Sequence, residues 1–351
     1  MVNTMKILGI ETSCDETAVS VIDVNAKNEI AVLSNVVSSQ VKLHAKFGGV
    51  VPNLAAREHA KNIGKVFKLA LKEANLKSLK EIDLIAVTRG PGLGPALLIG
   101  LTFAKASAWQ NSLPIIGVNH LLGHVYSNWL KNEKINEKKL FPIINLIVSG
   151  GHTELSLMNK HDQQKIIGET LDDAIGEAFD KVARLLDLGY PGGPIISKYA
   201  EKGNPNRYPL PRPMIHSKDF NFSYSGLKTA VLYLLRDLKE KGIEINENVK
   251  ADIAASFQEA ATDVVIQKTI KAARKYKVKS IMLSGGVSAN NSLREKLLSA
   301  CKNSDFAFYC PEMRYTTDNA TMIAVAGYYE FKHKKTANKW RNISMDANLS
   351  I

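Results

Sequence analysis

Two segments of the chain share one pattern of apolar and polar positions. Residues 6–23 (KILGIETSCDETAVSVID) and residues 143–158 (IINLIVSGGHTELSLM) each contain two apolar runs around a short polar turn. Apolar runs of this length, bounded by small and polar residues, are typical of buried strands. We therefore predict a strand–turn–strand unit in each segment and infer a duplicated α/β architecture with a cleft between its halves. Two unrelated hairpins are the alternative.

Helical and strand segments follow each of these units. Apolar residues at helical spacing predict helices over residues 54–76, 170–188 and 250–275, and an N-capped helix over 316–331. Short apolar runs predict strands over residues 82–88, 114–119 and 280–284. The polar stretch 131–140 is typical of a solvated linker and marks a domain boundary. The basic, polar end from Lys332 is expected to fray.

Composition and charge narrow the class of protein. The hydrophobic share of 45% and the charged share of 23% are ordinary for a soluble globular protein. No apolar stretch approaches the roughly 18–20 residues of a membrane span, and the start, MVNTMK, lacks the apolar core of a secretory signal, so we expect a cytosolic protein. The net charge of +12 favours an anionic partner, nucleic acid first, although a lysine-rich proteome would give the same excess.

Glycine-rich turns suggest a site for a phosphorylated ligand. They are RGPGLG (89–94), SGG (149–151), PGG (191–193) and SGGVSAN (284–290). Glycine lets the backbone approach a phosphate, and free N–H groups at a helix start bind anions. The chain has no GxxxxGK[ST] motif and no strand–helix GxGxxG motif with its acidic partner, which excludes the P-loop and Rossmann interpretations. An actin-like or sugar-kinase-like architecture remains, in which the hydroxyls and carboxylates of residues 12–17 face the phosphate or its metal ion.

A pair of histidines predicts a metal site. His120 and His124 are separated by three residues in NHLLGH (119–124), and on a helix such residues share one face, so both imidazoles can bind one ion. Two unrelated histidines are the alternative. Leu121 stands where an HExxH peptidase has its glutamate, which disfavours a zinc peptidase. The third ligand must come from elsewhere, and Asp318 in TTDNA is a candidate whose alternative role is helix capping.

Three further polar residues have both a functional and a structural interpretation. Asp180 can pair with Arg184 at helical spacing. Asn290 can occupy a left-handed turn. Asp15 can close the hairpin of residues 6–23. The sequence pattern alone leaves these alternatives open.

Ten segments of the chain, in order, resemble one family. They are GIETSCDET (9–17), SSQVKLHAKFGGVVPNLAAREH (38–59), GPGLGPALLIG (90–100), NHLLGH (119–124), LIVSGGHT (146–153), DDAIGEAFDKVARLL (172–186), YPGGP (190–194), FSYSGLKTAV (222–231), LSGGVSANNSLR (283–294) and TTDNATMIAVAG (316–327). Together they resemble the tRNA N6-adenosine threonylcarbamoyltransferase family of the bacterial and organellar (TsaD) type, over about residues 5–330. Ser197 departs from the aspartate of many relatives, which puts one ribose contact in doubt.

The resemblance implies an α/β fold of the ASKHA (actin-like ATPase) type. Its two duplicated, RNase H-like lobes enclose the active site in an interlobe cleft. We place the N-terminal lobe at residues 1–118, with a C-terminal helix (320–345) packing back on it, and the C-terminal lobe at residues 119–319.

The resemblance also implies an activity and its site residues. Such enzymes transfer the threonylcarbamoyl group from L-threonylcarbamoyladenylate to the N6 amine of adenosine 37, next to the anticodon, in tRNAs reading codons that begin with adenine, and they release AMP. One divalent metal ion per chain, Fe(2+) or alternatively Zn(2+), would be held by His120, His124 and Asp318. Asp15 corresponds to a residue implicated in activity. The adenylate-binding residues would be Ile147, Val148, Ser149, Gly150, Gly151, Asp180, Gly193 and Asn290.

The implied partners are tRNA, an inactive paralogue (TsaB-like) that dimerises through the N-terminal lobe, an ATPase (TsaE-like) and a separate synthase that makes the adenylate. The implied compartment is the cytoplasm. Two other functions stay open. A non-catalytic structural partner of the same superfamily would lack the histidine pair and the TDN motif. A small-molecule kinase of that superfamily would consume ATP without other proteins.

Overall fold

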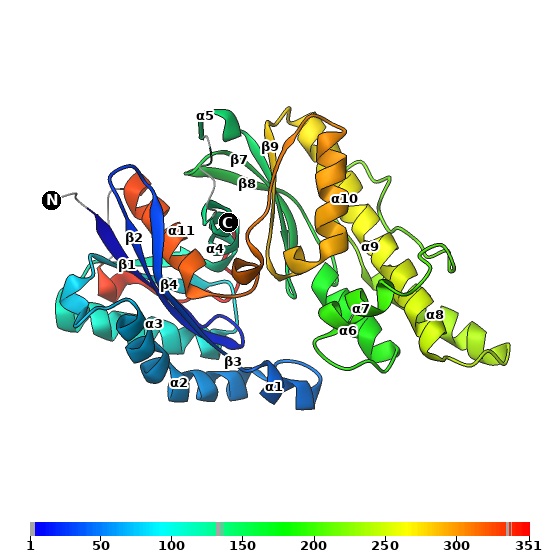
Figure 1. The fold of residues 1–351 in the computed structure, drawn as a ribbon, viewed down its shortest axis with the longest axis horizontal. Coiled ribbons are helices and arrows are strands. Elements are labelled where there is room, and N and C mark those ends of the chain that lie inside the picture. The colour runs from blue at the N-terminus through cyan, green and yellow to red at the C-terminus, as the bar shows by residue number, and fades with distance from the viewer. Residues whose placement is uncertain (1–3, 131–134, 136, 335–336, 338) are drawn as a thin grey trace. The chain divides into compact units, whose positions relative to one another are not determined.

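The computed structural model describes residues 4–130, 135, 137–334, 337 and 339–351. The chain forms two compact units, residues 1–134 with 311–351, and residues 135–310. Each unit contains one five-stranded sheet with its own helices (Figure 1). Among the described residues, no helix has the length and apolar character needed to cross a membrane.

The sheet of the first unit has the strand order β3-β2-β1-β4-β5. The strands are β1 (Met5–Glu11), β2 (Glu16–Val24), β3 (Ile30–Ser39), β4 (Leu84–Gly90) and β5 (Ile115–Asn119). β1, β2 and β3 are antiparallel neighbours, whereas β4 is parallel to β1 and β5 is parallel to β4. β1 lies in the centre and is buried on both faces, which explains its apolar run.

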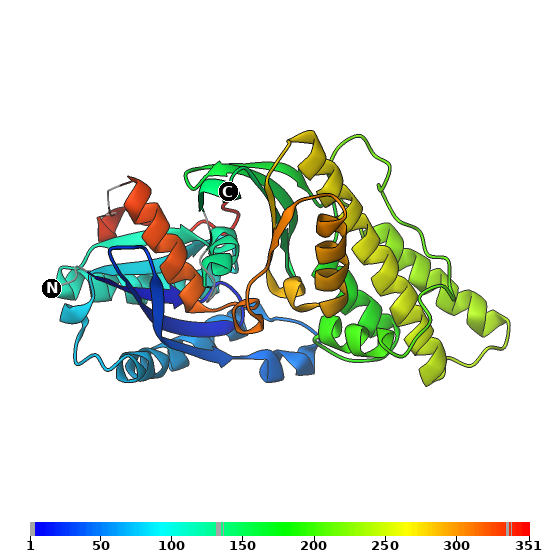
Figure 2. The ribbon, with the colours of Figure 1, turned by 45° about the horizontal axis from the view of Figure 1, so that its top comes forward.

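Helices cover both faces of this first sheet. α2 (Pro52–Glu73) and α3 (Gly94–Asn111) pack against the face that carries Leu8 and Ile10. Gly9 points to the opposite face, where α11 (Ala320–Lys334) comes so close that a Cβ atom on Gly9 would lie 2.1 Å from the backbone oxygen of Ala320. The short helices α1 (Val41–His44) and α4 (His120–Tyr126) complete the unit (Figures 1 and 2).

The sheet of the second unit repeats the first in order and direction, as β10-β9-β6-β7-β8. The strands are β6 (Ile143–Val148), β7 (Thr153–Lys160), β8 (Gln163–Glu169), β9 (Ser280–Ser284) and β10 (Ala307–Tyr309). β6, β7 and β8 are antiparallel neighbours, and β9 and β10 continue in parallel from β6. The same topology in both sheets confirms the predicted duplicated α/β fold and argues against two unrelated hairpins.

Among the described residues, six α-helices belong to the second unit. They are α5 (Glu137–Leu140), α6 (Ile175–Leu185), α7 (Gly192–Ala200), α8 (Ser225–Glu240), α9 (Glu247–Lys275) and α10 (Asn291–Lys302). One hydrophobic core joins α6 to α10 with β6, β7 and β9, and Phe179 and Phe257 pack edge to face inside it. α6 begins five residues later than the predicted helix 170–188, because Thr170 donates a side-chain hydrogen bond to the backbone oxygen of Asp173 in the preceding loop.

The compact units differ from the lobes expected at residues 1–118 and 119–319. Residues 119–134 and 311–319 belong to the first unit. The reason is the packing of α4 on α11, where a Cβ atom on Gly123 would lie 2.7 Å from the side chain of Ile323. The boundary between the units follows residue 134 and so falls within the predicted linker 131–140. Residues 131–134 and 136 lie outside the described part. The lobe boundaries themselves stay a prediction.

The end of the chain corrects the expectation that it frays. α11 ends at Lys334, short of the predicted 345, and residues 339–351 then pack on the first unit. Ile343 is buried in the core, and its backbone oxygen accepts a hydrogen bond from Lys105 Nζ (2.9 Å). The Asn119 side-chain amide donates to the backbone oxygen of Ser350 (3.2 Å). This C-terminal segment therefore lies across the ends of β4 and β5.

Candidate active site

α4 places the two histidines on one face. β5 ends at Asn119, whose side-chain oxygen accepts a hydrogen bond from the backbone N–H of Leu121 (2.8 Å) and so caps the helix. His120 and His124 follow one helical turn apart, and their side chains are almost completely buried. The prediction that both lie on one helix is confirmed.

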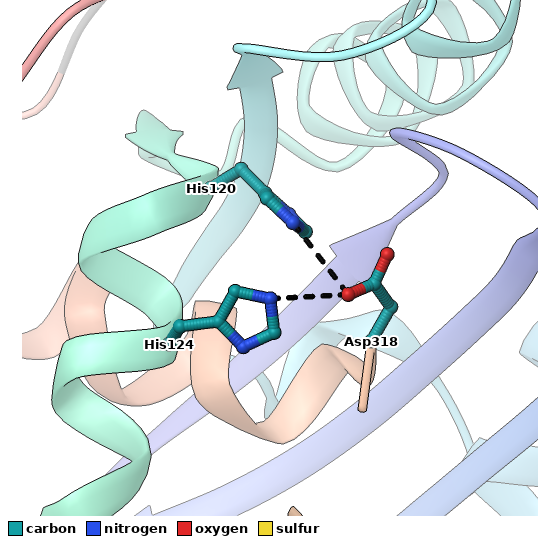
Figure 3. Close-up of side chains that lie close together, drawn as sticks. All are labelled: His120, His124 and Asp318. Carbon is teal, nitrogen blue, oxygen red and sulfur yellow. Dashed lines mark ion pairs between the residues drawn. The ribbon is translucent and has the colours of Figure 1, made fainter. Parts of the chain in front are cut away.

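Asp318 approaches both histidines from the segment before α11. The helix cap is Asn319, whose side-chain oxygen accepts from the backbone N–H of Met322 (3.0 Å), so capping is not the role of Asp318. Asp318 Oδ1 lies 3.1 Å from His124 Nε2 and 3.5 Å from His120 Nε2 (Figure 3). The structure thus brings Asp318 beside two histidines that lie about 200 residues earlier in the sequence.

The donor set fits a metal ion. The three ligand atoms lie within 4.8 Å of one another. Ligands at about 2.0–2.2 Å from a tetrahedral zinc ion are roughly 3.3–3.5 Å apart, which is close to the two separations between Asp318 and the histidines. Among the described residues, His124 Nδ1 is buried without a hydrogen-bond partner, while Nε2 faces Asp318 Oδ1 at 3.1 Å. A ring held in this way has a vacant lone pair for an ion, so the group could hold a metal.

The surroundings of the three residues are acidic. Burial lowers the pKa of His120, but the carboxylates of Asp318 and Glu11 outweigh it and raise that pKa to about 9. Burial also raises the pKa of Glu16, and the negative charges of Asp318 and Asp15 raise it further. Carboxylates gathered at this density favour a bound cation.

Glu11 is a site residue that the sequence analysis missed. Its Oε2 lies 3.0 Å from His120 Nδ1, and its side chain is completely buried. Ser13 Oγ lies 3.1 Å from the same nitrogen. A signal was present in the sequence, because Glu11 is a carboxylate at the end of a buried apolar strand, where an unpaired charge is costly.

Asp15 lies in the turn between β1 and β2. Its backbone oxygen accepts a hydrogen bond from the N–H of Gln40 (2.9 Å), which ties the turn to the end of β3. Its carboxyl group is buried, and its negative charge adds to the burial that raises the pKa values of Cys14 and Glu16. Asp15 is thus part of the acidic turn, as the sequence predicted, and its role in the reaction stays a prediction.

A second group of predicted residues lies in the second unit, at the turn after β6. Ile147 and Val148 end this buried strand. The turn Ser149–His152 is closed by a hydrogen bond from the Ser149 N–H to the His152 backbone oxygen (2.8 Å). A Cβ atom on Gly150 or Gly151 would meet no heavy atom within 4 Å. Neither glycine has a positive φ, so the backbone conformation does not require glycine at these positions. Packing inside the protein does not require it either.

Gly193 has the same property as these two turn glycines, whereas neighbouring glycines do not. A Cβ atom on Gly193 would also meet nothing within 4 Å. By contrast, a Cβ on Gly176 would lie 2.5 Å from the Ser149 backbone oxygen, and one on Gly192 would lie 2.6 Å from the Asp180 Cα atom. Gly176 and Gly192 are therefore required by packing, while Gly193 leaves its backbone open to a ligand.

Hydrogen bonds join the remaining predicted residues to these turns. Asp180 Oδ1 accepts from the Gly192 N–H (2.7 Å), so Asp180 holds the start of α7 rather than only pairing with Arg184. Burial raises the pKa of Asp180, although hydrogen bonds from the backbone N–H groups of Gly192 and Gly193 oppose the shift. Asn290 donates from Nδ2 to Ser197 Oγ (2.8 Å), and Ser197 in turn donates to the Gly193 oxygen (3.0 Å).

Asn290 also begins a helix. Its side-chain oxygen accepts from the Leu293 N–H (2.9 Å), which caps α10, and its φ of −69° rules out the left-handed turn considered from the sequence. The N-termini of α6, α7 and α10 thus accompany the glycine turns, and the positive end of a helix dipole suits an anion.

Comparisons with known proteins identify the family of the chain. A family model described as tRNA N6-adenosine threonylcarbamoyltransferase (TsaD) matches residues 31–325. Proteins of that name from Thermosipho melanesiensis, Persephonella marina and Bacillus cereus are 51%, 50% and 47% identical to the chain. The alignments cover 93%, 95% and 98% of this chain and 95%, 92% and 96% of those proteins, respectively.

Solved structures of lower identity share the fold. A crystal structure of full-length HypF in a phosphate- and nucleotide-bound form has a TM-score of 0.60 at 13% identity, and HypF from T. kodakarensis has 0.60 at 14%. The match covers 97% and 96% of this chain but only 57% and 49% of those longer chains, so it concerns the fold alone. The family model and the full-length relatives establish that the chain belongs to the tRNA N6-adenosine threonylcarbamoyltransferase family.

Proposed function

We propose that the protein transfers the threonylcarbamoyl group from L-threonylcarbamoyladenylate to the N6 amine of adenosine 37 in tRNAs that read codons beginning with adenine. AMP is the leaving group. Family membership supports the reaction class. The observation that carries the proposal is the convergence of His120, His124 and Asp318, because a non-catalytic structural partner would have no use for this ligand set.

The metal ion of this proposal is Fe(2+), with Zn(2+) as the alternative. When bound, a divalent ion supplies Lewis-acid stabilisation of negative charge on a phosphate or carboxylate oxygen. His120 and His124 would each bind it through Nε2 and Asp318 through Oδ1, and three protein ligands leave coordination positions for substrate. The buried helix α4 fixes the two imidazoles before substrate arrives, which avoids reorganisation during the reaction.

The glycine turns of the second unit would bind the adenylate. Gly150 and Gly151 after β6 would offer backbone N–H groups to the phosphate, with the Ser149 side chain and the open space at Gly193 beside them. Asp180 would accept from the ribose hydroxyls while its bond to Gly192 keeps the loop in place.

The remaining predicted residues would complete the site. Ile147 and Val148 form the buried base of the β6 turn, and Asn290 would contact the adenylate from the start of α10. The N6 amine is a poor nucleophile that must lose a proton, and Asp15 is our candidate for the proton acceptor.

The proposed partners follow from the family and from charge. tRNA is the acceptor substrate, and the net charge of +12 suits a polyanion. An inactive paralogue (TsaB-like), an ATPase (TsaE-like) and an adenylate synthase would complete the system, and the cytoplasm would be its compartment.

A reconstituted assay tests the proposal. Protein purified without oxygen is analysed for metal and then mixed with its partner proteins, tRNA, threonine, bicarbonate and ATP, and the modified nucleoside is measured by mass spectrometry. We expect modified adenosine that disappears on chelation and returns with added Fe(2+). Full activity of a metal-free protein would contradict the metal role. ATP consumption with phosphorylation of a small molecule by this chain alone would support a kinase instead.

A further inference from the structure

Glu11 makes a direct contact with one proposed metal ligand. It is the last residue of β1, and its side chain is completely buried. Glu11 Oε2 lies 3.0 Å from His120 Nδ1. An ionised carboxylate only accepts hydrogen bonds, so the imidazole donates its Nδ1 proton to Glu11.

The other partners of Glu11 are donors as well. The hydroxyl of Thr88 donates to Oε2 (2.6 Å), and the backbone N–H of Ser13 donates to Oε1. Both carboxylate oxygens therefore accept. A glutamine in the same place would direct its NH₂ group at one of these donors, so the position demands a carboxylate rather than any polar side chain.

The hydrogen bond has a consequence for the other nitrogen of the ring. With the proton on Nδ1, the lone pair of neutral His120 is on Nε2, and Nε2 is the atom that faces Asp318. His124 has no such support, because its Nδ1 is buried without a hydrogen-bond partner among the described residues. The two histidines are thus positioned in different ways, one by a carboxylate and the other by packing in α4.

We propose that Glu11 is a positioning residue of the metal site, which fixes the tautomer and ring orientation of His120 so that Nε2 binds the ion. The inference rests on the proposed function, since it requires an ion at His120. Carboxylates that accept from the second nitrogen of a ligating imidazole typically change metal affinity about 10- to 100-fold when they are replaced.

Ser13 is the rival for this role. Its hydroxyl lies 3.1 Å from the same Nδ1 atom. A hydroxyl both donates and accepts, so it tolerates either tautomer, whereas the carboxylate of Glu11 tolerates only one. Replacing each residue separately therefore distinguishes the two.

Metal affinity provides the first measurement. The Zn(2+) dissociation constant of the full chain is measured by competition with a chromogenic chelator for wild type and the Glu11→Gln, Glu11→Ala and Ser13→Ala variants. We expect both Glu11 variants to bind about 10- to 100-fold more weakly and Ser13→Ala to stay within about threefold. The matched control is Glu154→Gln, which neutralises another buried carboxylate in the second unit and should bind like wild type.

The tautomer provides a second measurement, which needs no variant. Nitrogen NMR of zinc-loaded wild type, labelled on its histidines and assigned with a His120→Ala spectrum, should show His120 protonated at Nδ1 and metal-bound at Nε2. This result remains informative even if Glu11→Ala does not fold.

Specific results would overturn the inference. Glu11→Gln affinity within about twofold of wild type, or a larger loss in Ser13→Ala than in Glu11→Gln, would remove the role of Glu11 and leave the metal site intact. A His120 ring protonated at Nε2 in the zinc-loaded protein would do the same. A wild type that binds no metal would contradict the proposed site and the role of Glu11 with it.

Discussion

The turns between the first two strands of each sheet occupy the same place in the topology and differ in chemistry. In the first unit, the turn lies between the paired residues Glu11 and Ala18 and carries buried carboxyl groups beside His120. In the second unit, the turn lies between Val148 and Thr153 and contains no carboxylate, with open space around its two glycines. One turn is acidic, and the other exposes its backbone.

The difference shows how a duplicated fold provides two binding chemistries. The strand register fixes where each turn lies, whereas the side chains decide which ligand it favours. Carboxylates and imidazoles suit a cation, and exposed N–H groups suit an anion. We therefore expect changes in one turn to leave the ligand affinity of the other turn unchanged. The following predictions test that independence and the contrast between the units, from the largest effect to the smallest.

Replacing His120 with alanine should have the largest effect. Loss of one of three protein ligands should remove the bound ion and lower the transfer rate about a thousandfold or more, while adenylate affinity stays within about threefold of wild type. Metal analysis measures the bound ion, tRNA nucleoside analysis measures the transfer rate, and calorimetry with an adenylate analogue measures the adenylate affinity. The exposed His216→Ala variant is the matched control. If His120→Ala lost metal affinity and adenylate affinity equally, the two turns would not be independent binding sites.

Gly150→Ala should give the complementary result. The new methyl group meets no protein atom within 4 Å, so the free energy of unfolding should change little. It would occupy the space of the adenylate phosphate, and we expect affinity to fall about tenfold or more with metal binding unchanged. Gly64→Ala on α2, which also has open space, is the control. Unchanged adenylate affinity in Gly150→Ala would show that this turn is not the phosphate site.

Buried carboxylates should behave oppositely in the two units. Burial raises the pKa of Glu11, but the charge of His120 and the hydrogen bonds from His120 and Thr88 outweigh it and lower that pKa. Burial and the negative charge of Glu169 instead raise the pKa of Glu154 to about 7. Folded Glu154 thus keeps a proton that the unfolded chain has lost, and its contribution to stability disappears as pH rises from about 4.5 through 7.

Glu154→Gln should therefore stabilise the protein at high pH only. We expect the gain in the free energy of unfolding to be about 2 kcal/mol larger at pH 8 than at pH 4.5. Urea unfolding at both pH values measures it, with the exposed Glu201→Gln as the comparison variant. A gain that is equal at both pH values would show that Glu154 ionises normally in the folded protein.

Replacing a helix cap should have the smallest effect on stability, and the effect should be similar in the two units. Asn319 caps α11 and Asn290 caps α10, so alanine at either position should cost about 1 kcal/mol. Serine should recover most of the loss in both. Only the Asn319 variant should also lower metal affinity, because it loosens the segment that holds Asp318. Unfolding curves and zinc titrations of the two variants check this, and a metal effect in Asn290→Ala would contradict it.

Sequence patterns predicted the central strands well and the edge strands poorly. β1 and β6 are buried on both faces, so they appear in the sequence as uninterrupted apolar runs. The edge strand β8 has the sequence QQKIIGE with mixed exposure, which resembles a loop, and we did not predict it. Tertiary packing against β7 rather than intrinsic propensity makes it a strand.

The residues of the candidate site likewise divide into those that a local sequence pattern predicts and those that it does not. Helical spacing placed His120 and His124 together, and the resemblance supplied Asp318, whose approach to them depends on the packing of α4 and α11. Glu11 was missed because its partner His120 is 109 residues away, so no local pattern marks the pair. The docked C-terminal segment was missed for a related reason, since its hydrogen bonds are made by backbone oxygens that any sequence supplies.

The docked C-terminus has a practical consequence for protein engineering. Ser350 accepts a hydrogen bond from the residue that caps the histidine helix, so a fusion joined after Ile351 would begin two residues beyond that contact. A polyhistidine tag there would add competing imidazoles to the same chain end. Purification handles and reporter domains for metal studies therefore belong ahead of β1.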